Sequence, residues 1–470
     1  MTSGTDAYSG GEETSRGTDG APAQMSWGGH LRATFALGVP LVGSQLGLML
    51  INTTDTVMLG WYSVEALAAA VLATPLFFVV MIFGSGFSQA VMPIAAQAEG
   101  KGDTRGVRRA VRMGLWVAIG FSALVMAPLW YTEAILLALG QDEQIAALAG
   151  DYMRIAQWAM FPTLIAQGLR AFLSAVERPR IIFWSTVAGA VLNALLNWAL
   201  IFGNWGAPEL GVKGAAIASL GTTTLTLIVL TVYVMFEKKS AEYEIFARFW
   251  RPDWPDLREV LRVGLPIAVT ILAEVGLFVI SSILMGWLGV VALAAHGIAM
   301  QLSSIAFMVP LGLSQAATVR VGRAFGKGDA LGLNRAAAAA MGVCLAFGTV
   351  SAMLFWLVPE WLIALFLDND EQKAPEVIAY AVPLLLITAL FHLFDNAQAV
   401  GAGLLRGLKD TRVPMWLAIV SYWVVGFPLA YSLGFIAGWG GIGVWCGLAA
   451  GLAFAAVAMN GRFLLLRPAP

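Results

Sequence analysis

The chain has 470 residues, of which 59% are hydrophobic and only 12% are charged, and its mean hydropathy is +0.77. This composition excludes an ordinary soluble domain and predicts an integral membrane protein. The formal net charge of -1 and the lack of a basic run give no indication of a nucleic-acid partner. The partner that the composition does predict is the lipid bilayer itself.

The chain begins with a polar stretch, residues 1–29, that is rich in Gly, Ser, Thr and Asp and lacks an apolar segment. We expect it to be a disordered cytoplasmic tail and not a cleaved signal. Crossing a hydrocarbon layer of ~30 Å takes ~20 apolar residues. By that criterion the rest of the chain predicts twelve spanning helices, at residues 33–59, 64–97, 107–131, 149–175, 180–203, 212–236, 258–287, 291–323, 334–358, 375–404, 412–436 and 441–466.

Residues 38–103 recur, without a gap, as residues 264–329, an offset of 226 residues (264 minus 38). The matched segments include Gly60-Trp61 with Gly286-Trp287, Ser88-Gln89-Ala90 with Ser314-Gln315-Ala316, and Gly100-Lys101-Gly102-Asp103 with Gly326-Lys327-Gly328-Asp329. A repeat of this length indicates two homologous halves. We therefore expect an all-α membrane protein with two six-helix bundles, residues 30–236 and 258–466, joined by a cytoplasmic linker at 237–257. Because both halves enter the membrane from the same side, the bundles should be related by a pseudo-two-fold axis along the membrane normal.

Lysine and arginine gather in alternate connections between the predicted helices, and the other connections are acidic or neutral. Since cytoplasmic loops hold most of the basic residues, this pattern predicts that both termini are cytoplasmic. The basic connections contain Lys101, Arg105, Arg108, Arg109 and Arg112, then Arg178 and Arg180, Lys238 to Arg262, Arg320 to Arg335, and Arg406, Lys409 and Arg412.

Three carboxylates fall inside predicted spanning helices: Asp55, Glu274 and Asp395. An ionisable group there costs at least a few kcal/mol, so it faces a partner or a cavity and not lipid. Each is either a structural hydrogen-bond acceptor for a neighbouring helix or a cation-binding group, and Asp55 could also be exposed at the outer interface. A buried carboxylate binds Na⁺ when ionised or takes up H⁺, because desolvation disfavours its charged form. Either event removes negative charge and can be coupled to the release of a cationic ligand.

The repeat sharpens these candidates, because Asp55 falls opposite Ser281 in the second copy and Glu274 falls opposite Leu48 in the first. Acidic residues that differ between two otherwise similar halves point to function and not to scaffold. We therefore predict a cation site at Glu274, Asp395 and Asp55, with Na⁺ as one candidate ion at Glu274 and Asp395.

Beside these acids, we predict a substrate or ion cavity whose residues are Asn52, Asn193, Asn197, Phe391 and His392. Asn193 and Asn197 are four residues apart and share a helix face, so they either join two helices or offer neutral oxygens to an ion or drug. His392 lies three residues before Asp395 and shares its face, so it either tunes that carboxylate or has a packing role. No nucleotide-binding glycine loop, zinc motif or serine-hydrolase motif is present, so we expect no cofactor and no enzymatic activity.

Three segments together resemble the multidrug and toxic compound extrusion (MATE) family: Asp-Thr-Val-Met-Leu-Gly at 55–60, Pro-Ile-Ala-Ala-Gln at 93–97 before Gly-Lys-Gly-Asp, and Leu-Leu-Arg-Gly-Leu-Lys-Asp at 404–410. The similarity covers about residues 30–465 and is closest to the NorM-like bacterial branch. It implies a monomeric, twelve-helix antiporter of the bacterial inner membrane that expels cationic lipophilic drugs in exchange for Na⁺ or H⁺.

The resemblance also implies roles for single residues. Glu274 and Asp395 stand where that branch has its cation-binding acids, Asp55 matches its first-helix aspartate, and Asn193 and Asn197 match its fifth-helix asparagines. A tyrosine that some members have one turn before the tenth-helix aspartate is Phe391 here, which removes a hydroxyl ligand for Na⁺. His392 beside it keeps H⁺ coupling open.

Two other functions remain alternatives at this stage. A lipid-linked saccharide flippase with the same fold should carry basic residues in its cavity to hold phosphate, and Arg170 is the candidate that the sequence offers. An intramembrane enzyme should show clustered His, Cys or acidic motifs near one loop, and the sequence has none.

Overall fold

The computed structural model describes residues 25–366 and 373–468. Helices account for nearly all of this part of the chain. Those of the first half are α1 Trp27–Tyr62, α2 Val64–Gly100, α3 Thr104–Trp130, α4 Thr132–Ala138, α5 Glu143–Ala156, α6 Met160–Ala175, α7 Pro179–Phe202 and α8 Val212–Phe236. After the short α9 Lys238–Ala241 come α10 Trp254–Trp287, α11 Val290–Lys327, α12 Ala330–Leu357, α13 Pro359–Ala364, α14 Ala374–Gly407, α15 Arg412–Ile419, α16 Phe427–Tyr431 and α17 Gly440–Leu466.

Among the described residues, eleven helical segments are long and apolar enough to cross a membrane. The remaining predicted span, the fourth in chain order, consists of α5 and α6, two short helices that a 3₁₀ turn at Gln157–Ala159 separates. This span begins at Glu143 and not at the predicted residue 149, because the polar residues of its first turn, such as Glu143, give no hydropathy signal. The eleventh span continues from α15 to residue 436 through π-helical turns at Val420–Gly426 and Ser432–Ile436, on either side of Pro428. Proline cannot donate a backbone hydrogen bond, which favours such local unwinding.

The predicted ends of the first helix and of the linker need small corrections. Residues 1–24 of the predicted tail lie outside the described residues, and α1 already begins at Trp27, where the Ser26 hydroxyl accepts a hydrogen bond from the Gly29 amide. An N-cap of this kind fixes a helix start. Similarly, α10 begins at Trp254, so residues 254–257 of the predicted linker are helical.

The repeat seen in the sequence is also a repeat of local structure. Asp103 accepts a hydrogen bond from the Gly106 amide at 2.8 Å to begin α3, and Asp329 accepts one from the Gly332 amide at 2.7 Å to begin α12. The residue before each aspartate is a glycine in the left-handed region, with φ of 71° and 72°. A side chain is strained in that conformation, so glycine is required at both turns.

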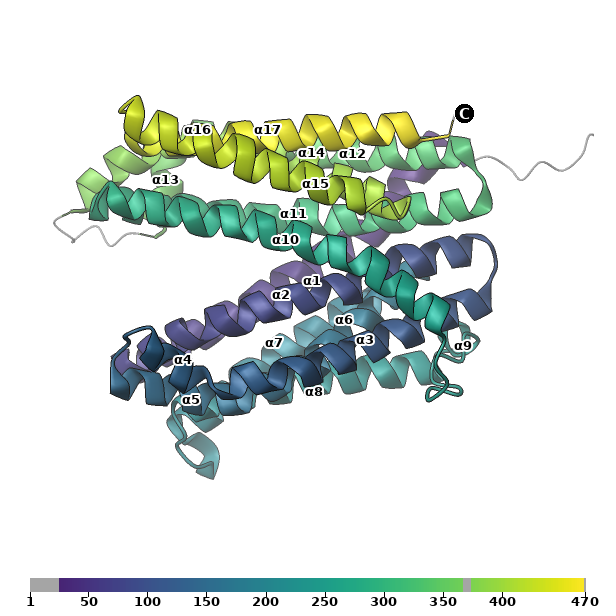
Figure 1. The fold of residues 1–470 in the computed structure, drawn as a ribbon, viewed down its shortest axis with the longest axis horizontal. Helices are drawn as coiled ribbons and strands as arrows, with labels where there is room; N and C mark the ends of the chain where they lie inside the picture. Colours follow the sequence, from purple (N-terminus) through teal and green to yellow (C-terminus); the bar gives the residue numbers. More distant parts are fainter. Residues whose placement is uncertain (1–24, 367–372, 469–470) are drawn as a thin grey trace, which may run out of the picture.

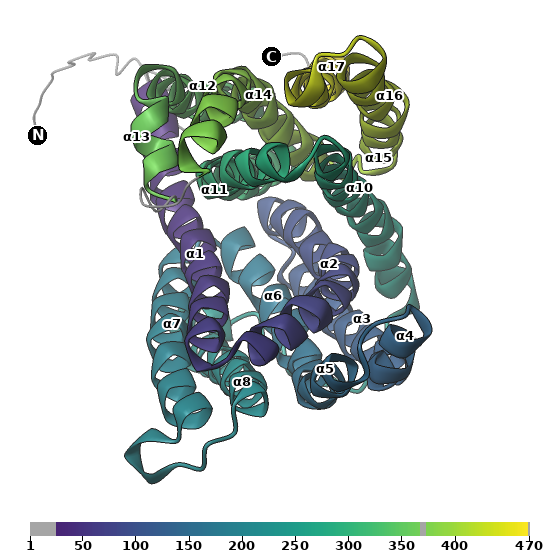
Figure 2. The same ribbon diagram turned by 90° about the vertical axis from the view of Figure 1, so that its left-hand side faces the viewer.

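The helices form two layers that converge at one end and diverge at the other (Figure 1). Helices α2 to α8 form one layer and α11 to α17 the other, as the end-on view also shows (Figure 2). The first helix of each half crosses between the layers: α1 packs against α7 and against α11 and α12, and α10 packs against α2 and α3 and against α15. The pairing of α1 with α11 and of α10 with α2 is what a two-fold relation between the halves requires.

A set of four glycines lets these crossing helices approach closely, and we call it the glycine seam: Gly38, Gly86, Gly264 and Gly312. A Cβ atom added at Gly86 of α2 would lie 2.5 Å from the backbone nitrogen of Ala268 on α10. One added at Gly312 of α11 would lie 2.6 Å from the backbone nitrogen of Val42 on α1. Residues 86 and 312, and residues 42 and 268, are each separated by the repeat offset of 226. The two contacts are therefore copies of each other.

Polar bridges accompany the glycine seam at the end where the layers converge. Arg320 of α11 donates to the His30 carbonyl at 2.7 Å and to the Thr34 hydroxyl of α1. The Gln97 amide of α2 donates to the Gly407 carbonyl of α14 at 2.8 Å. Each of these contacts joins a helix of the first half to a helix of the second half, so both packing and hydrogen bonds hold this end of the molecule shut.

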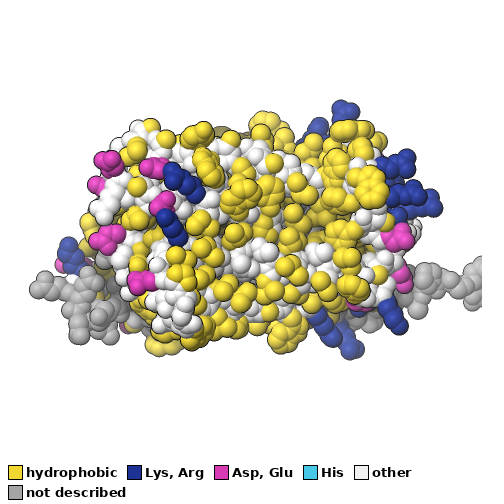
Figure 3. All heavy atoms as spheres, turned by 90° about the horizontal axis from the view of Figure 1, so that it is seen from below, with side chains coloured by type: hydrophobic (Ala, Val, Ile, Leu, Met, Phe, Trp, Pro, Cys, Tyr) yellow, Lys and Arg dark blue, Asp and Glu magenta, His cyan; other side chains and the backbone are white. Residues whose placement is uncertain are grey.

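The surface has an apolar band between two polar ends (Figure 3). We call one the basic end; it carries the α2–α3, α6–α7, α11–α12 and α14–α15 connections and α9, and it is the end where the layers converge. The opposite, acidic end carries α4, α13 and the α7–α8 connection. Lysine and arginine gather at the basic end in Figure 3, and the view shows most of its acidic side chains at the other end. Together with the apolar helices, this surface is that of a multi-pass membrane protein.

The segment between the halves packs against the basic end of α2 and α3. Arg108 donates to the Tyr243 carbonyl at 2.8 Å, and the Trp116 indole donates to the Phe249 carbonyl at 2.9 Å. The Tyr243 hydroxyl donates to Glu99 at 2.5 Å. Burial, together with this hydrogen bond, raises the pKa of Tyr243, so the phenol stays protonated and remains the donor. The segment is therefore an ordered strap that is tied to one side of the molecule.

Candidate functional site

The first candidate site, which we call the Asp55 cluster, lies where α1, α7 and α8 meet. The side-chain amides of Asn193 and Asn197 donate to one Asp55 oxygen at 2.9 and 2.6 Å, and the Ser219 hydroxyl donates to the other at 2.8 Å. Both asparagines are fully buried. Of the two roles predicted for them, the geometry supports the joining of helices, because their amides tie α7 to α1 through Asp55. The side-chain oxygen of Asn197, Oδ1, is buried without a partner in the described chain, so one acceptor remains for a ligand.

Asn52 does not join this cluster. Its side chain is exposed, and only its backbone carbonyl has a side-chain partner among the described residues, the Thr56 hydroxyl at 3.0 Å. The structure therefore gives Asn52 no contact with Asp55, although the two lie one turn apart on α1.

The second candidate site, which we call the acidic pair, consists of Glu274 on α10 and Asp395 on α14. The two carboxylates lie within electrostatic range of each other, and Arg406 and Tyr422 lie within range of Glu274. Asp395 is 3% exposed, and its Oδ1 atom has no hydrogen-bond partner among the described residues. Glu274 is half-buried and likewise forms no hydrogen bond or ion pair in the described chain. A buried carboxylate oxygen without a donor is costly unless a cation or proton occupies it for part of the cycle.

A neutral hydroxyl lies within electrostatic range of both acids: that of Tyr422, which is fully buried and has no partner within the described residues. Asn396 follows Asp395 on α14, and its side-chain amide is likewise buried and unpartnered in the described chain. Gly348 of α12 makes room for the Asn396 amide, since a Cβ there would collide with it. No three His, Cys, Asp or Glu side chains of the described chain are grouped as metal ligands. A Na⁺ ion at the acidic pair would thus depend on neutral oxygens such as these, which suit a hard cation.

His392 and Phe391 take different places beside Asp395. The His392 ring is buried, with Nε2 3.1 Å from the Ser303 hydroxyl of α11, and its centroid lies 5.3 Å from the Phe355 ring. No hydrogen bond joins His392 to Asp395 in the described part of the chain, so the contacts favour packing and helix-joining for this histidine. Phe391 packs against Phe278 and Trp445, with ring centroids 6.2 and 5.5 Å away, and forms an apolar wall.

The predicted cation-binding residues thus divide into two sites. Asp55 belongs to the α1–α7–α8 side, and the acidic pair belongs to α10 and α14 on the other side. Three polar contributors escaped the sequence analysis: Ser219, Asn396 and Tyr422. Asn396 could have been found from its position next to Asp395, whereas a single serine or tyrosine in an apolar helix gives no signal of its own.

Arg170, the basic residue considered for phosphate binding, lies half-buried on α6. Its guanidinium donates to the Thr186 hydroxyl of α7 at 3.3 Å, and its Nε atom is buried without a partner among the described residues. The arginine therefore joins two helices of the first half.

Comparison with known proteins follows the same division into halves. A family model described as MatE matches residues 40–199 and again residues 266–432. The two matches begin 226 residues apart (266 minus 40), which is the offset of the internal repeat. Probable multidrug resistance proteins NorM from Rhizobium meliloti and Agrobacterium fabrum are 51% and 50% identical to this chain. The alignments cover 95% and 94% of this chain and 96% and 95% of those relatives.

Solved structures with the same fold include the eukaryotic MATE transporter AtDTX14 and a multidrug resistance MATE family transporter described in an outward-facing conformation. Their TM-scores are 0.81 and 0.84 at 22% and 20% sequence identity. Each comparison covers 94% of this chain and 97% of the other. At this identity the likeness concerns the fold, which is that of two six-helix bundles. Because the family model matches both halves and relatives of about half-identical sequence align along nearly the whole chain, this protein belongs to the MATE family, in its NorM-like branch.

Proposed function

We propose that this protein is a secondary active efflux transporter that exports cationic lipophilic compounds in exchange for Na⁺ or H⁺. Membership of the MATE family and the multidrug resistance names of its relatives support the transport class. The observation that carries the coupling mechanism is the acidic pair: Asp395 is buried with an unpartnered oxygen, and Glu274 lies half-buried within electrostatic range of it with no partner in the described chain.

The coupling follows from charge. An empty, ionised acidic pair attracts a cationic drug, and a Na⁺ ion or protons at Glu274 and Asp395 remove that attraction. The incoming ion then weakens drug binding in the state that opens to the outside, which is how exchange arises. The Asp55 cluster offers a third carboxylate, but its three donors already occupy it. We therefore assign the primary coupling role to the acidic pair.

Alternating access of the two bundles supplies the path. The layers converge at the basic end and diverge toward the acidic end (Figure 1), which resembles an outward-open arrangement if the basic end is cytoplasmic. The positive-inside tendency supports that orientation, with both termini in the cytoplasm of a bacterium and the protein in its inner membrane. Rocking about the seam between α1, α2, α10 and α11 would then open the basic end to load drug.

The acidic pair is tested by replacing each carboxylate with its amide, in Glu274→Gln and Asp395→Asn. We expect ethidium efflux from cells that express either variant to fall by about tenfold or more. A neutral amide has no charged form to attract the cationic drug, and it cannot take up a proton to release the drug. Glu133→Gln is the matched control, since Glu133 is a surface carboxylate paired with Arg154 at 2.9 Å and should tolerate the change. Normal efflux by both amide variants, at equal amounts of protein in the membrane, would remove the role that we assign.

The coupling ion is identified with purified protein in proteoliposomes. Na⁺ and pH gradients are imposed separately, and accumulation of ethidium is followed by fluorescence. The gradient that drives accumulation by the wild-type protein, and fails to do so with Glu274→Gln, names the coupling ion. Accumulation that needs neither gradient would contradict antiport.

A further inference from the structure

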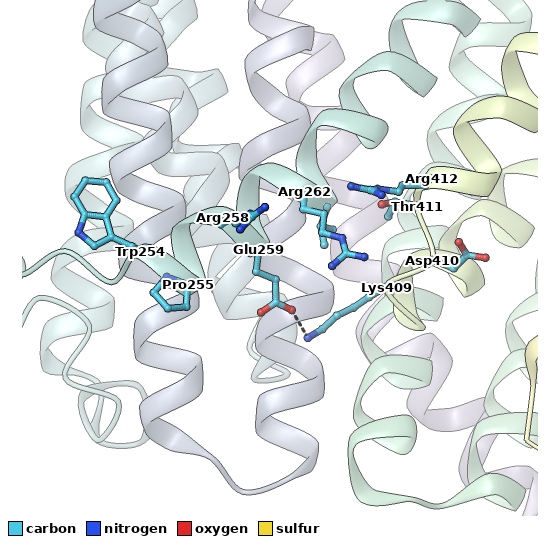
Figure 4. A pocket seen from close by; sticks show the side chains of 10 residues that line it. Trp254, Pro255, Arg258, Glu259, Arg262, Lys409, Asp410, Thr411 and Arg412 are labelled. Carbon is cyan, nitrogen blue, oxygen red and sulfur yellow. Dashed lines mark hydrogen bonds and ion pairs between the residues drawn. The ribbon is translucent and has the colours of Figure 1, made fainter.

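A cavity at the basic end lies outside the acidic pair and the Asp55 cluster. It has a volume of about 1090 Å³ and opens between the first turns of α10 and the α14–α15 turn. Figure 4 shows its lining, with Arg258 and Arg262 on α10 and Arg412 on α15. We call it the arginine pocket.

The charges of the arginine pocket are unbalanced. Its two acidic residues are both engaged: Glu259 is paired with Lys409 at 2.7 Å, as the dashed line in Figure 4 shows, and Asp410 is paired with Arg462 of α17 at 3.0 Å. In contrast, Arg258, Arg262 and Arg412 form no ion pair with any described carboxylate. Three exposed guanidinium groups therefore line the cavity without a paired carboxylate among the described residues. An anion is the ligand that this arrangement favours.

The geometry is suited to phosphate. Arg258 and Arg262 are one turn apart on the same face of α10, and Arg412 points toward Arg262 from the other wall in Figure 4. Planar guanidinium groups match phosphate oxygens in a bidentate manner. Thr411 and Arg412 at the start of α15 also line the cavity, and the positive end of a helix dipole adds to the attraction for an anion.

Apolar side chains continue from the pocket along the lipid-facing surface. On α10, Leu261 and Leu265 are 41% and 47% exposed and alternate with the arginines at positions 258, 261, 262 and 265, which is one helix face. Trp254 at the start of α10 and Trp416 one turn into α15 are also exposed, at 67% and 62%. Tryptophan is enriched where a membrane protein meets the headgroup layer, and basic pockets there bind anionic lipid headgroups. A soluble phosphate compound would leave these apolar surfaces unused.

From these observations we infer that the arginine pocket binds the phosphate headgroup of an anionic phospholipid, whose acyl chains lie along α10 and α15. The site has a consequence for the helix that carries Glu274. The Glu259–Lys409 ion pair joins α10 to the α14–α15 turn at the base of the pocket, and the headgroup would join the same two walls from above. Bound lipid therefore holds the first turns of α10 against α15. It does so whichever ion drives transport.

The test measures the affinity of purified protein in detergent for dioleoyl phosphatidylglycerol, from the rise of its thermal unfolding midpoint. Dioleoyl phosphatidylcholine and inorganic phosphate are the two comparison probes. We expect phosphatidylglycerol to raise the midpoint and Arg258→Ala/Arg262→Ala to weaken its apparent affinity about 30-fold, roughly fivefold for each guanidinium removed. The matched control is Arg32→Ala/Arg180→Ala, which removes two exposed arginines from the basic end outside the pocket and should keep the wild-type affinity.

Each other outcome overturns part or all of the inference. Equal stabilisation by phosphatidylcholine would show that the headgroup charge is not recognised. Stabilisation by inorganic phosphate alone, to the same extent as by the lipid, would make the ligand a soluble anion. Wild-type affinity of the pocket variant would remove the site. Arg412→Ala gives an independent variant from the opposite wall if the double variant fails to fold, and we expect about a fivefold loss for it.

Discussion

The glycine seam gives the sharpest prediction about how the bundles move. In Gly312→Ala the new Cβ would lie 2.6 Å from the backbone nitrogen and 2.8 Å from the Cα of Val42. In Gly86→Ala it would lie 2.5 and 2.6 Å from the same atoms of Ala268. Ordinary contacts between such atoms are about 3.5–4.0 Å, so each pair of helices must separate by roughly 1 Å. The obstacle is backbone in both cases, and no rotamer change relieves it.

The size of the effect follows from the cost of overpacking. Adding a methyl group to a tight contact costs typically 1–3 kcal/mol. In the rocking that we propose, the contact is lost when the basic end opens, so the cost falls on the shut state and not on the opened one. We expect the equilibrium between the two states to shift by roughly 5- to 150-fold toward opening of the basic end.

The assay measures access to the seam by cysteine labelling. A cysteine is introduced at Ala96, which is fully buried on α2 beside α11, in a protein whose Cys344 and Cys446 are replaced by alanine. We expect Gly312→Ala and Gly86→Ala to increase the rate of maleimide labelling at position 96 by about fivefold or more. Gly297→Ala is the control on the same helix as Gly312, since nothing lies within 4 Å of a Cβ there. Labelling rates of Gly312→Ala and Gly86→Ala that match the control would refute the reasoning.

Three further substitutions separate structural from functional roles. Asp55→Asn should lower the thermal unfolding midpoint, because a neutral amide oxygen accepts weaker hydrogen bonds from Asn193 and Asn197 than a carboxylate does, at a cost of roughly 1–3 kcal/mol. Asn52→Ala on the same helix should leave the midpoint unchanged, and an equal loss in both would contradict the Asp55 cluster. Tyr422→Phe should change the free energy of unfolding by less than about 0.5 kcal/mol, since the hydroxyl has no partner among the described residues. The same variant should weaken Na⁺-driven or H⁺-driven ethidium uptake if that hydroxyl helps to bind the ion at the acidic pair. His392→Gln should lower the thermal unfolding midpoint and reduce efflux only in proportion to the amount of folded protein. A changed pH dependence of transport by the folded variant would instead make the histidine a coupling group.

Much of this molecule could be anticipated from the order of its residues. Hydropathy alone locates twelve spans, because the bilayer requires long apolar helices whatever they pack against. The offset of 226 residues, read from matched segments, returns in the family matches, in the caps at Asp103 and Asp329, and in the glycine seam. The same dependence on hydropathy explains the differences: α5 begins at Glu143 and α10 at Trp254, earlier than the predicted 149 and 258, because the first turn of each helix is polar.

The class of protein, the two-fold plan and the unusual acids Asp55, Glu274 and Asp395 follow from the order of the residues, since local composition or comparison of the two halves reveals each. The partners of these acids depend on packing: Asp55 is held by Asn193 and Asn197, whereas Asp395 keeps an oxygen without a partner among the described residues. Hydrogen bonding between helices depends on how each helix is rotated and which neighbour it meets, and apolar spans carry little information about either. For the same reason the sequence does not predict the arginine pocket. Arg258, Arg262 and Arg412 are far apart or not distinctive in the sequence, and the packing of α10 against α15 brings them to one cavity.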